Sequence, residues 1–360
     1  MIRKKVAIWA PLRYANIGDD MQAIAFARHI QKIGYDVKLF QLDETLSKIY
    51  GFESVSNVDD LCKDVNLCVI AGGALLTPFR WYKRLLDSQA KEYENDFRDL
   101  YIATQRYPNI RFCAISMGGD GKVKAPKKWY SNWRIKFFGS PSFINGTVRL
   151  EGDVEQMRQA FGKDFQYHAD MLFRTPDYFQ PELLPSTQKK RICLQFKKRH
   201  LDSKLIDAIY QYAEFHDDME FHFITTHMPK IGLTYQYLPK KESKNIIIDQ
   251  YQTPNQLLGV LASCDVIITS MLHVGLMGLT VGTPFVSYRG PGKTKSFLQS
   301  IGGDWAILPD DISFDALNDE VLNKSKMQLM GQYNQKVFDG MFNDSKMQYE
   351  FCSKIVKEYA

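Results

Sequence analysis

Short apolar runs alternate with longer segments of helical spacing along most of this chain, and the pattern occurs in two successive series. The apolar runs of the first series cover residues 6–10, 37–42, 67–71, 110–116 and 143–150. Between the first two runs, apolar residues share one helical face, and Gly34 follows as a helix stop. A strand, loop, helix, strand order that repeats in this way predicts a parallel sheet covered by helices.

The second series begins after residues 178–191, a proline-containing, polar and basic stretch that is typical of a linker. Its apolar runs cover residues 192–196, 220–225, 245–249, 266–269 and 284–288. Thr253 and Pro254 open a helix between two of them, because the hydroxyl caps the helix and proline suits its first turn. From about residue 315 to the end, the spacing is helical.

A chain of 360 residues is long for one compact unit, and the two series predict two domains. We expect an N-terminal Rossmann-like domain over residues 1–180 and a C-terminal one over 181–340, which face a cleft. The last helix, over 341–360, should pack back on the N-terminal domain. Open parallel sheets bind ligands at the carboxyl ends of their strands, so the loops that follow strands hold the candidate site residues.

Composition excludes several other classes of protein. With 45% hydrophobic and 24% charged residues, the chain has the composition of an ordinary globular protein. Its six cysteines form no CxxC pair, which favours a reduced, cytoplasmic setting. The first apolar run is too short for a signal peptide, so we expect none, and no apolar stretch reaches the roughly 18 residues that a membrane span needs. The net charge of +5 suggests anionic partners without choosing among a phosphate substrate, a nucleic acid and a lipid surface.

In the first series, glycines and polar residues follow the strands. Asn16, Gly18 and Asp19 lie between the first run and a helix, and Gly72 and Gly73 follow the third run. Glycine allows a close backbone approach, and the amides at a helix start favour an anion or a sugar oxygen. The same residues also suit a helix cap and a tight turn, so both interpretations stand.

Two further candidates end this half of the chain. Arg149 lies at the end of the fifth run, and Asp170 lies in FQYHADMLF as a helix cap or a contact for a substrate hydroxyl. The histidines show no HExxH or comparable ligand spacing, so the sequence predicts no metal site.

In the second series, Ser270 and His273 follow the run over 266–269, and His273 begins a glycine-dense helical segment. An imidazole near a helix start has its pKa lowered toward a range useful in acid–base catalysis. A histidine buried in the core is the alternative interpretation. The next strand leads to Arg289 and Lys293, which suit a substrate with carboxylate and phosphate groups, although a solvated basic loop has the same composition.

Several of these segments, in order, resemble the polysaccharide pyruvyl transferase family. They are NIGDD, CVIAGGALL, VRLEGD, FQYHADMLF and ITSMLHVGLMGLTVGTPFVSYRGPGKTKSFL. The last segment is the most specific, because it combines the histidine, a G-x-P turn before a strand and a lysine before a helix. The resemblance covers most of the chain and implies two domains of the glycosyltransferase B type.

The resemblance implies transfer of a pyruvyl group from phosphoenolpyruvate to two hydroxyls of a sugar, as a cyclic ketal on a surface polysaccharide or its precursor. His273 matches the family's histidine and is expected to transfer the proton. Arg149 and Lys293 match its arginine and lysine, and are expected to hold the carboxylate and phosphate of the donor. No cofactor or metal is needed for this chemistry.

The chain departs from the family pattern at two positions. Met271 stands where the family commonly has arginine, so an anion contact is absent or is supplied by Arg289. Ala74 stands where the family often has a third glycine. The first departure implies an altered donor site.

Basic and aromatic residues alternate over 121–140, which suits a peripheral contact with an anionic membrane and a lipid-linked oligosaccharide acceptor. The aromatics also suit a core with solvated lysines beside it. No nucleic-acid-binding module accompanies the segment. Two other functions fit the same architecture: a nucleotide-sugar-dependent glycosyltransferase and a noncatalytic partner in polysaccharide assembly.

Overall fold

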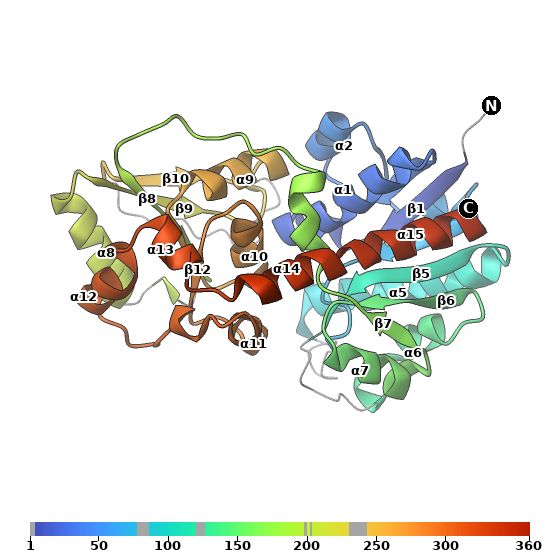
Figure 1. The fold of residues 1–360 in the computed structure, drawn as a ribbon. Helices are drawn as coiled ribbons and strands as arrows, with labels where there is room; N and C mark the ends of the chain where they lie inside the picture. Colours follow the sequence, from blue (N-terminus) through green and yellow to red (C-terminus); the bar gives the residue numbers. More distant parts are fainter. Residues whose placement is uncertain (1–3, 78–85, 120–126, 198–199, 202–203, 230–242) are drawn as a thin grey trace. The chain divides into compact units, whose positions relative to one another are not determined.

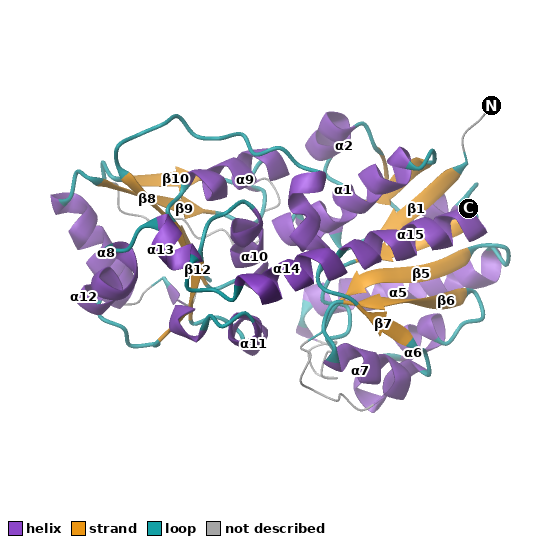
Figure 2. Ribbon diagram, in the orientation of Figure 1, coloured by secondary structure: helices purple, strands orange, loops and turns teal. Residues whose placement is uncertain are grey.

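The computed structural model describes residues 4–77, 86–119, 127–197, 200–201, 204–229 and 243–360 (Figure 1). The chain forms two compact units. The first unit comprises residues 1–13, 19–171 and 343–360, and the second comprises 14–18 and 172–342. Each unit is built around one parallel sheet, whose strands are flanked by helices in Figure 2.

The sheet of the first unit has seven parallel strands in the order β3-β2-β1-β4-β5-β6-β7. Its strands are β1 (Lys5–Trp9), β2 (Asp36–Phe40), β3 (Glu53–Val55), β4 (Leu67–Ala71), β5 (Arg111–Met117), β6 (Phe143–Val148) and β7 (Phe165–Tyr167). The strand order reverses between β1 and β4, and ligands bind at such a reversal in open α/β sheets. Asn16 and Gly18 follow β1, and Gly72 and Gly73 follow β4.

The helices of the first unit include α1 (Ile17–Lys32), α2 (Glu44–Tyr50), α3 (Val58–Cys62), α5 (Ser88–Arg106), α6 (Asn132–Phe138), α7 (Gly152–Phe161) and α15 (Lys346–Tyr359). The first two residues of α1 group with the second unit. The last helix, α15, contacts β5 and belongs to the first unit. Phe26 of α1 packs on Tyr349 of α15, with ring centroids 5.1 Å apart.

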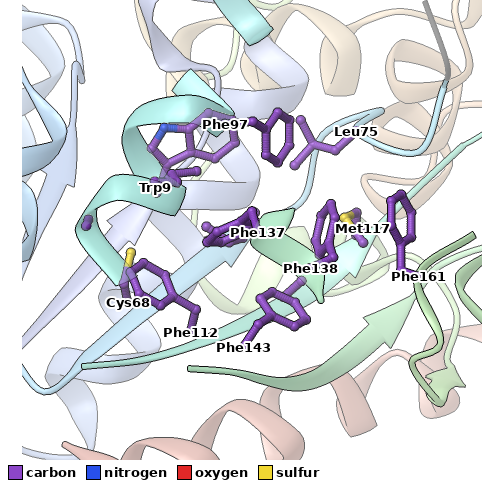
Figure 3. Close-up of a cluster of buried hydrophobic side chains, with 14 of the residues drawn as sticks. Trp9, Cys68, Leu75, Phe97, Phe112, Met117, Phe137, Phe138, Phe143 and Phe161 are labelled. Atoms are coloured by element: carbon purple, nitrogen blue, oxygen red, sulfur yellow. The ribbon is translucent and has the colours of Figure 1, made fainter. Parts of the chain in front are cut away.

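Figure 3 shows part of the aromatic core of the first unit, in which Phe137 and Phe138 of α6 lie among Trp9, Phe97 and Phe112. For the aromatics of α6, this core supports the alternative interpretation of residues 121–140, and a membrane contact by the rest of that segment stays a prediction. Phe137 and Phe138 are fully buried, and so are the nearby Tyr130 and the charged Arg134, whereas Trp129 is 37% exposed. Residues 120–126 of that segment lie outside the described part of the chain.

The sheet of the second unit repeats the same strand order, as β10-β9-β8-β11-β12-β13. Its parallel strands are β8 (Lys190–Gln195), β9 (Met219–Ile224), β10 (Ile246–Asp249), β11 (Val266–Thr269), β12 (Phe285–Tyr288) and β13 (Ile307–Leu308). The order reverses between β8 and β11, so Ser270 and His273 follow a strand at the reversal.

The helices associated with the second sheet are α8 (Lys204–Phe215), α9 (Pro254–Ser263), α10 (Leu272–Thr280), α11 (Gly292–Ser300), α12 (Phe314–Leu317), α13 (Lys326–Met330) and α14 (Gln335–Asp344). Thr253 caps α9 as expected: its side chain accepts a hydrogen bond from the amide of Gln256, and Pro254 occupies the first turn.

The prediction of two Rossmann-like parallel sheets is confirmed. The boundaries differ from the expected ones. The main boundary falls after Met171 instead of near residue 180, residues 14–18 group with the second unit, and residues 343–360 return to the first. Within the stretch expected as a linker, Lys190 and Arg191 already belong to β8. Their side chains bond to the protein, since Lys190 donates to the carbonyl of Lys324 and Arg191 to that of Pro185.

Candidate active site

The candidate proton donor, His273, is the second residue of α10 in the second unit. The glycines that follow it allow the helix to pack closely on the sheet. A Cβ atom on Gly275 would lie 2.4 Å from the ring of Phe285, and one on Gly278 would lie 2.1 Å from the side chain of Ile267. The apolar part of α10 is therefore fixed against β11 and β12, and the half-buried His273 lies at its start.

Gly18 packs directly on the imidazole of His273. A Cβ atom on Gly18 would lie 2.3 Å from Nδ1 of His273, far closer than two such atoms can approach. The amide of Gly18 donates to Oδ1 of Asn16 at 3.0 Å. The structure therefore brings together three residues predicted for the site, Asn16, Gly18 and His273, within the second unit.

Backbone hydrogen bonds hold the 14–18 segment in place. Asn16 forms an antiparallel bridge with His227. The amide of Ile17 donates to the carbonyl of Thr226 at 2.9 Å, and that of Met228 donates to Ala15 at 3.2 Å. The hydroxyl oxygen Oγ1 of Thr226 also lies 3.7 Å from Sδ of Met271, the residue that precedes α10.

His227 is a functional candidate that the sequence reasoning missed. Its Nε2 lies 3.0 Å from Nδ2 of Asn16. Oδ1 of Asn16 accepts the hydrogen bond from the amide of Gly18, so the side-chain nitrogen Nδ2 of Asn16 faces the imidazole of His227. Nδ2 can only donate, and Nε2 of His227 therefore accepts this hydrogen bond. Burial lowers the pKa of His227 to about 4, so the ring is neutral near pH 7. Its Nδ1 then carries the proton and donates to the hydroxyl of Thr226 at 3.2 Å.

Ser270 has its hydroxyl inside the protein. The side chain is fully buried, its Oγ donates to the carbonyl of Tyr288 at 2.9 Å, and Nδ1 of His200 lies 3.0 Å away. These contacts tie the end of β11 to the end of β12. Binding of substrate by Ser270 itself stays a prediction.

The cations that follow β12 lie at the start of α11. Lys293 is the second residue of that helix, whose first turn contains no acidic residue. Arg289 adopts the left-handed conformation, with φ of 51°. Its Nη2 donates to the carbonyl of Asp310 at 2.8 Å, and its guanidinium lies 5.1 Å from the ring centroid of Tyr288.

In the first unit, the structure pairs two predicted residues, Arg149 and Asp170. Nη1 of Arg149 lies 3.3 Å from Oδ2 of Asp170, and the two side chains are 5% and 9% exposed. Nη2 of Arg149 donates to the carbonyl of Gly73 at 3.4 Å. A Cβ atom on Gly118 would lie 2.4 Å from Nε of Arg149, so the guanidinium packs closely on that backbone.

Gln22 of α1 connects these residues to the glycine pair. Its Oε1 accepts from the amide of Gly73 at 3.1 Å, and its Nε2 donates to Asp170 at 3.3 Å. A Cβ atom on Gly72 would lie 2.0 Å from Oε1 of Gln22, and both glycines have positive φ, 59° and 76°. The glycine pair is required here by conformation and by the close approach of Gln22.

The C-terminal part of the chain holds the segment that carries Asp170. The carboxylate of Asp344 accepts from the amide of Ala169 at 2.6 Å and lies 3.1 Å from Nδ1 of His168. Gln348 donates from Nε2 to the carbonyls of His168 and Ala169. Asp19, another predicted contact, lies half-buried in the first turn of α1.

Among the described residues, no group of three or more histidine, cysteine, aspartate or glutamate side chains could hold a metal ion. All six cysteines are buried and in the thiol form. In the part of the chain that the structure describes, each helix is too short or too polar to cross a membrane.

Residues 169–289 match the model of the polysaccharide pyruvyl transferase family. The resemblance to polysaccharide pyruvyl transferases is confirmed. The matched span contains Asp170, Ser270, His273 and Arg289, and it ends before Lys293. No curated protein shows a significant match to the sequence.

Solved structures confirm the fold, which is of the glycosyltransferase B type. The UDP-GlcNAc 2-epimerase from Neisseria meningitidis, bound to UDP-GlcNAc, has a TM-score of 0.56 at 10% identity and covers 97% of this chain and 100% of its own. The glycosyltransferase SnogD from Streptomyces nogalater has a TM-score of 0.52 at 11% identity, with 99% of each chain covered. At such identities the likeness concerns the fold alone.

Proposed function

We propose that this protein transfers a pyruvyl group from phosphoenolpyruvate to two hydroxyls of a sugar, forming a cyclic ketal. The sugar belongs to a surface polysaccharide or to its lipid-linked precursor. The observation that carries the proposal is the family match over residues 169–289, which contains His273 at the start of α10. A cytoplasmic location and a peripheral membrane contact belong to the same proposal.

In this proposal His273 is the general acid. The imidazolium gives its proton to the methylene carbon of phosphoenolpyruvate, and positive charge develops at the neighbouring carbon. A sugar hydroxyl adds to that carbon and loses its proton. The bond to the phosphate oxygen then breaks, and a second hydroxyl closes the ring as it loses its own proton. One proton replaces the one taken from His273, and the other leaves with phosphate.

The packing of Gly18 on His273 supports this role. A proton donor must hold one orientation relative to the carbon that it protonates, because small displacements cost large factors in rate. Glycine at position 18 lets the backbone lie against Nδ1, as the distance of 2.3 Å from its ideal Cβ position shows. Hydrogen bonds to Asn16 and Thr226 fix that backbone in turn.

The anionic groups of the donor need cations. Lys293 at the start of α11 is proposed to hold phosphate or carboxylate, and the helix start adds to its positive potential. Arg149 is proposed as a second contact. Because Asp170 already pairs with Arg149, this contact is weaker than that of an unpaired arginine. Asp170 is proposed to accept a hydrogen bond from a sugar hydroxyl.

The experiment that tests the proposal is incubation of the protein with phosphoenolpyruvate and a panel of lipid-linked and synthetic oligosaccharides. We expect release of inorganic phosphate together with the mass gain of one pyruvyl group on an acceptor. A parallel panel with UDP- and TDP-sugars tests the glycosyltransferase alternative. Transfer from a nucleotide sugar, with no product from phosphoenolpyruvate, would replace the proposal by that alternative.

A further inference from the structure

Gln348 of α15 makes three side-chain hydrogen bonds inside the first unit, and the proposed mechanism gives it no role. The side chain is fully buried. Its Nε2 donates to the carbonyls of His168 at 2.9 Å and Ala169 at 3.2 Å. Its Oε1 accepts from the hydroxyl of Thr147 in β6. This one buried amide therefore joins the C-terminal helix to two segments that are distant from it in the sequence.

The hydrogen bonds around Thr147 fix the orientation of this amide. The hydroxyl of Thr147 accepts from the backbone amide of Ser116 at 2.9 Å, which leaves its own proton to donate to Oε1 of Gln348. Because Oε1 lies on the side of Thr147, Nε2 faces the carbonyls of residues 168 and 169, which can only accept. The direction of each hydrogen bond in this network is thus determined.

Ser116 closes the network at the end of β5. Its side chain is fully buried, and its Oγ accepts from the amide of Met171 at 3.4 Å. Its φ is 56°, in the left-handed region that residues other than glycine seldom adopt. The pairing of β5 with β6 also shifts register between Ala114 and Met117. Strained conformations of this kind persist only where the surrounding structure fixes them, and they cluster at functional sites.

This network holds the backbone on both sides of Asp170. The carbonyl of Ala169 accepts from Gln348, and the amide of Met171 donates to Ser116. Buried polar networks in which each member has its partner are rigid and specify one arrangement of their groups. The hydrogen bonds of Gln348 therefore limit where the carboxylate of Asp170 can lie.

The same network reaches Arg149, the partner of Asp170. Thr147, which donates to Gln348, lies two residues before Arg149. The amide of Arg149 donates to the carbonyl of Met117 in β5 at 3.1 Å. Nη1 of Arg149 then lies 3.3 Å from Oδ2 of Asp170. Both members of the ion pair are thus attached to the same set of buried hydrogen bonds.

We infer that Gln348 is a positioning residue for the Arg149–Asp170 pair, so that the C-terminal helix is part of the functional site. Gln348 acts through the backbone of residues 168–171 and through Thr147, and it is too deeply buried to touch a substrate. A link from this pair to phosphoenolpyruvate rests on the proposed function. The positioning of the pair does not, because the contacts are present without a ligand.

The first test is the nuclear magnetic resonance signal of the Nε–H group of Arg149 in the full-length protein with isotope-labelled arginine, assigned by its loss in Arg149→Lys. Gln348→Leu and Thr147→Val should each shift this resonance, because each breaks the network. Phe137→Ala is the matched control, since it destabilises the same unit from the aromatic core. A resonance that stays at its wild-type position in both variants, or that Phe137→Ala shifts as far, would overturn the inference.

Thr147→Val keeps the test decisive if Gln348→Leu does not fold, because valine has the shape of threonine and lacks only the hydroxyl. The double variant Thr147→Val, Gln348→Leu tests whether the two residues act as one unit. Its loss of stability in urea denaturation should be smaller than the two single losses combined, since either change breaks the same hydrogen bond. Fully additive losses would contradict a shared network.

Kinetics test the link to the donor. In the pyruvyl transfer assay, Gln348→Leu should raise KM for phosphoenolpyruvate roughly tenfold, as expected for the loss of one hydrogen bond to a charged group. Phe137→Ala, assayed well below its Tm, should leave KM unchanged. A shifted Arg149 resonance with unchanged KM would overturn the link to the donor. A shifted resonance in a protein that forms no ketal would leave the positioning role standing and overturn the proposed function.

Discussion

Gly18 lies so close to His273 that a methyl group at position 18 would fall 2.3 Å from Nδ1 of the imidazole. The two residues are far apart in the sequence, and both belong to the second unit. Backbone hydrogen bonds from residues 15–17 to residues 226–228 hold Gly18 in this position. The glycine of the NIGDD motif therefore has a structural role, because its missing side chain lets the backbone pack against the imidazole of His273.

Gly18→Ala should reduce kcat strongly while the protein stays folded, because the added methyl group displaces the ring of His273. We expect a loss of at least about a hundredfold, since a misplaced catalytic group costs that much in rate. The measurement is steady-state release of phosphate from phosphoenolpyruvate in the presence of the acceptor. Gly340→Ala in α14 is the control, because a Cβ atom there meets nothing within 4 Å. Equal turnover in Gly18→Ala and the wild type would contradict the positioning role of Gly18.

Arg149→Ala should lower the free energy of unfolding by about 3–5 kcal/mol, because it leaves the buried Asp170 carboxylate without its cation. It should also raise KM for phosphoenolpyruvate, because Arg149 is the proposed second contact for the donor. The double variant Arg149→Ala, Asp170→Asn separates the two effects. We expect it to recover part of the stability, as measured by urea denaturation, but none of the donor affinity. Recovery of donor affinity in the double variant would show that Arg149 acts only as the partner of Asp170.

His227 should make the stability of the protein depend on pH below neutrality. Burial lowers its pKa from about 6.5 in the unfolded chain to about 4 in the folded protein. Between these values the unfolded state binds more protons, so stability falls as the pH falls. From pH 7 to pH 5 this effect amounts to at most about 2 kcal/mol. His227→Gln keeps an acceptor for Asn16 and should reduce the slope; urea titrations at several pH values that give the wild-type slope in the variant would contradict this assignment.

Residues of α6 should behave as core residues and not as membrane contacts. Phe137→Ala should lower the free energy of unfolding by about 3–5 kcal/mol, because it opens a cavity among Trp9, Phe97 and Phe112. Trp129→Ala, at a side chain that is 37% exposed, should change stability little. Thermal denaturation measures both. The proposed peripheral membrane contact predicts that Trp129→Ala weakens binding to anionic liposomes without a change in Tm.

The fold could be predicted from the sequence because long buried strands carry a strong periodic signal. The runs that became β4 and β11 have the predicted bounds, and all of their residues are buried. The strands that were not predicted, β3, β7 and β13, are short. β3 and β7 have three residues each, mostly exposed or half-buried, and β13 has only two. Such short edge strands depend on pairing with a neighbour and not on an apolar run of their own.

The candidate site could be predicted only in part. The rule that ligands bind after parallel strands selected Gly18, Gly73 and His273, because glycine allows a close backbone approach and histidine can transfer a proton. It did not select Gln22, which lies within α1 and bridges Gly73 and Asp170. The sequence does not show which groups from distant parts of the chain will bond to a polar residue on a helix, because those partners depend on the tertiary fold. His227 follows β9 and could have been found by the same rule.

The alternation of basic and aromatic residues over 121–140 shows another limit of prediction from sequence. Basic and aromatic residues that alternate suit both a membrane surface and a helix with one buried face. In α6, Arg134 is 1% exposed and donates to the carbonyls of Leu75 and Thr77. A buried arginine with backbone partners cannot be told from a surface arginine by composition.

The most direct measurement of the central claim is the release of inorganic phosphate from phosphoenolpyruvate by the wild type and by His273→Gln, in the presence of the oligosaccharide panel. Glutamine keeps much of the size of histidine but cannot act as an acid near neutral pH. We predict acceptor-dependent release of phosphate by the wild type and its loss in the variant, with Tm unchanged. Turnover by His273→Gln at the wild-type rate would contradict the assignment of His273 as the proton donor of a pyruvyl transferase.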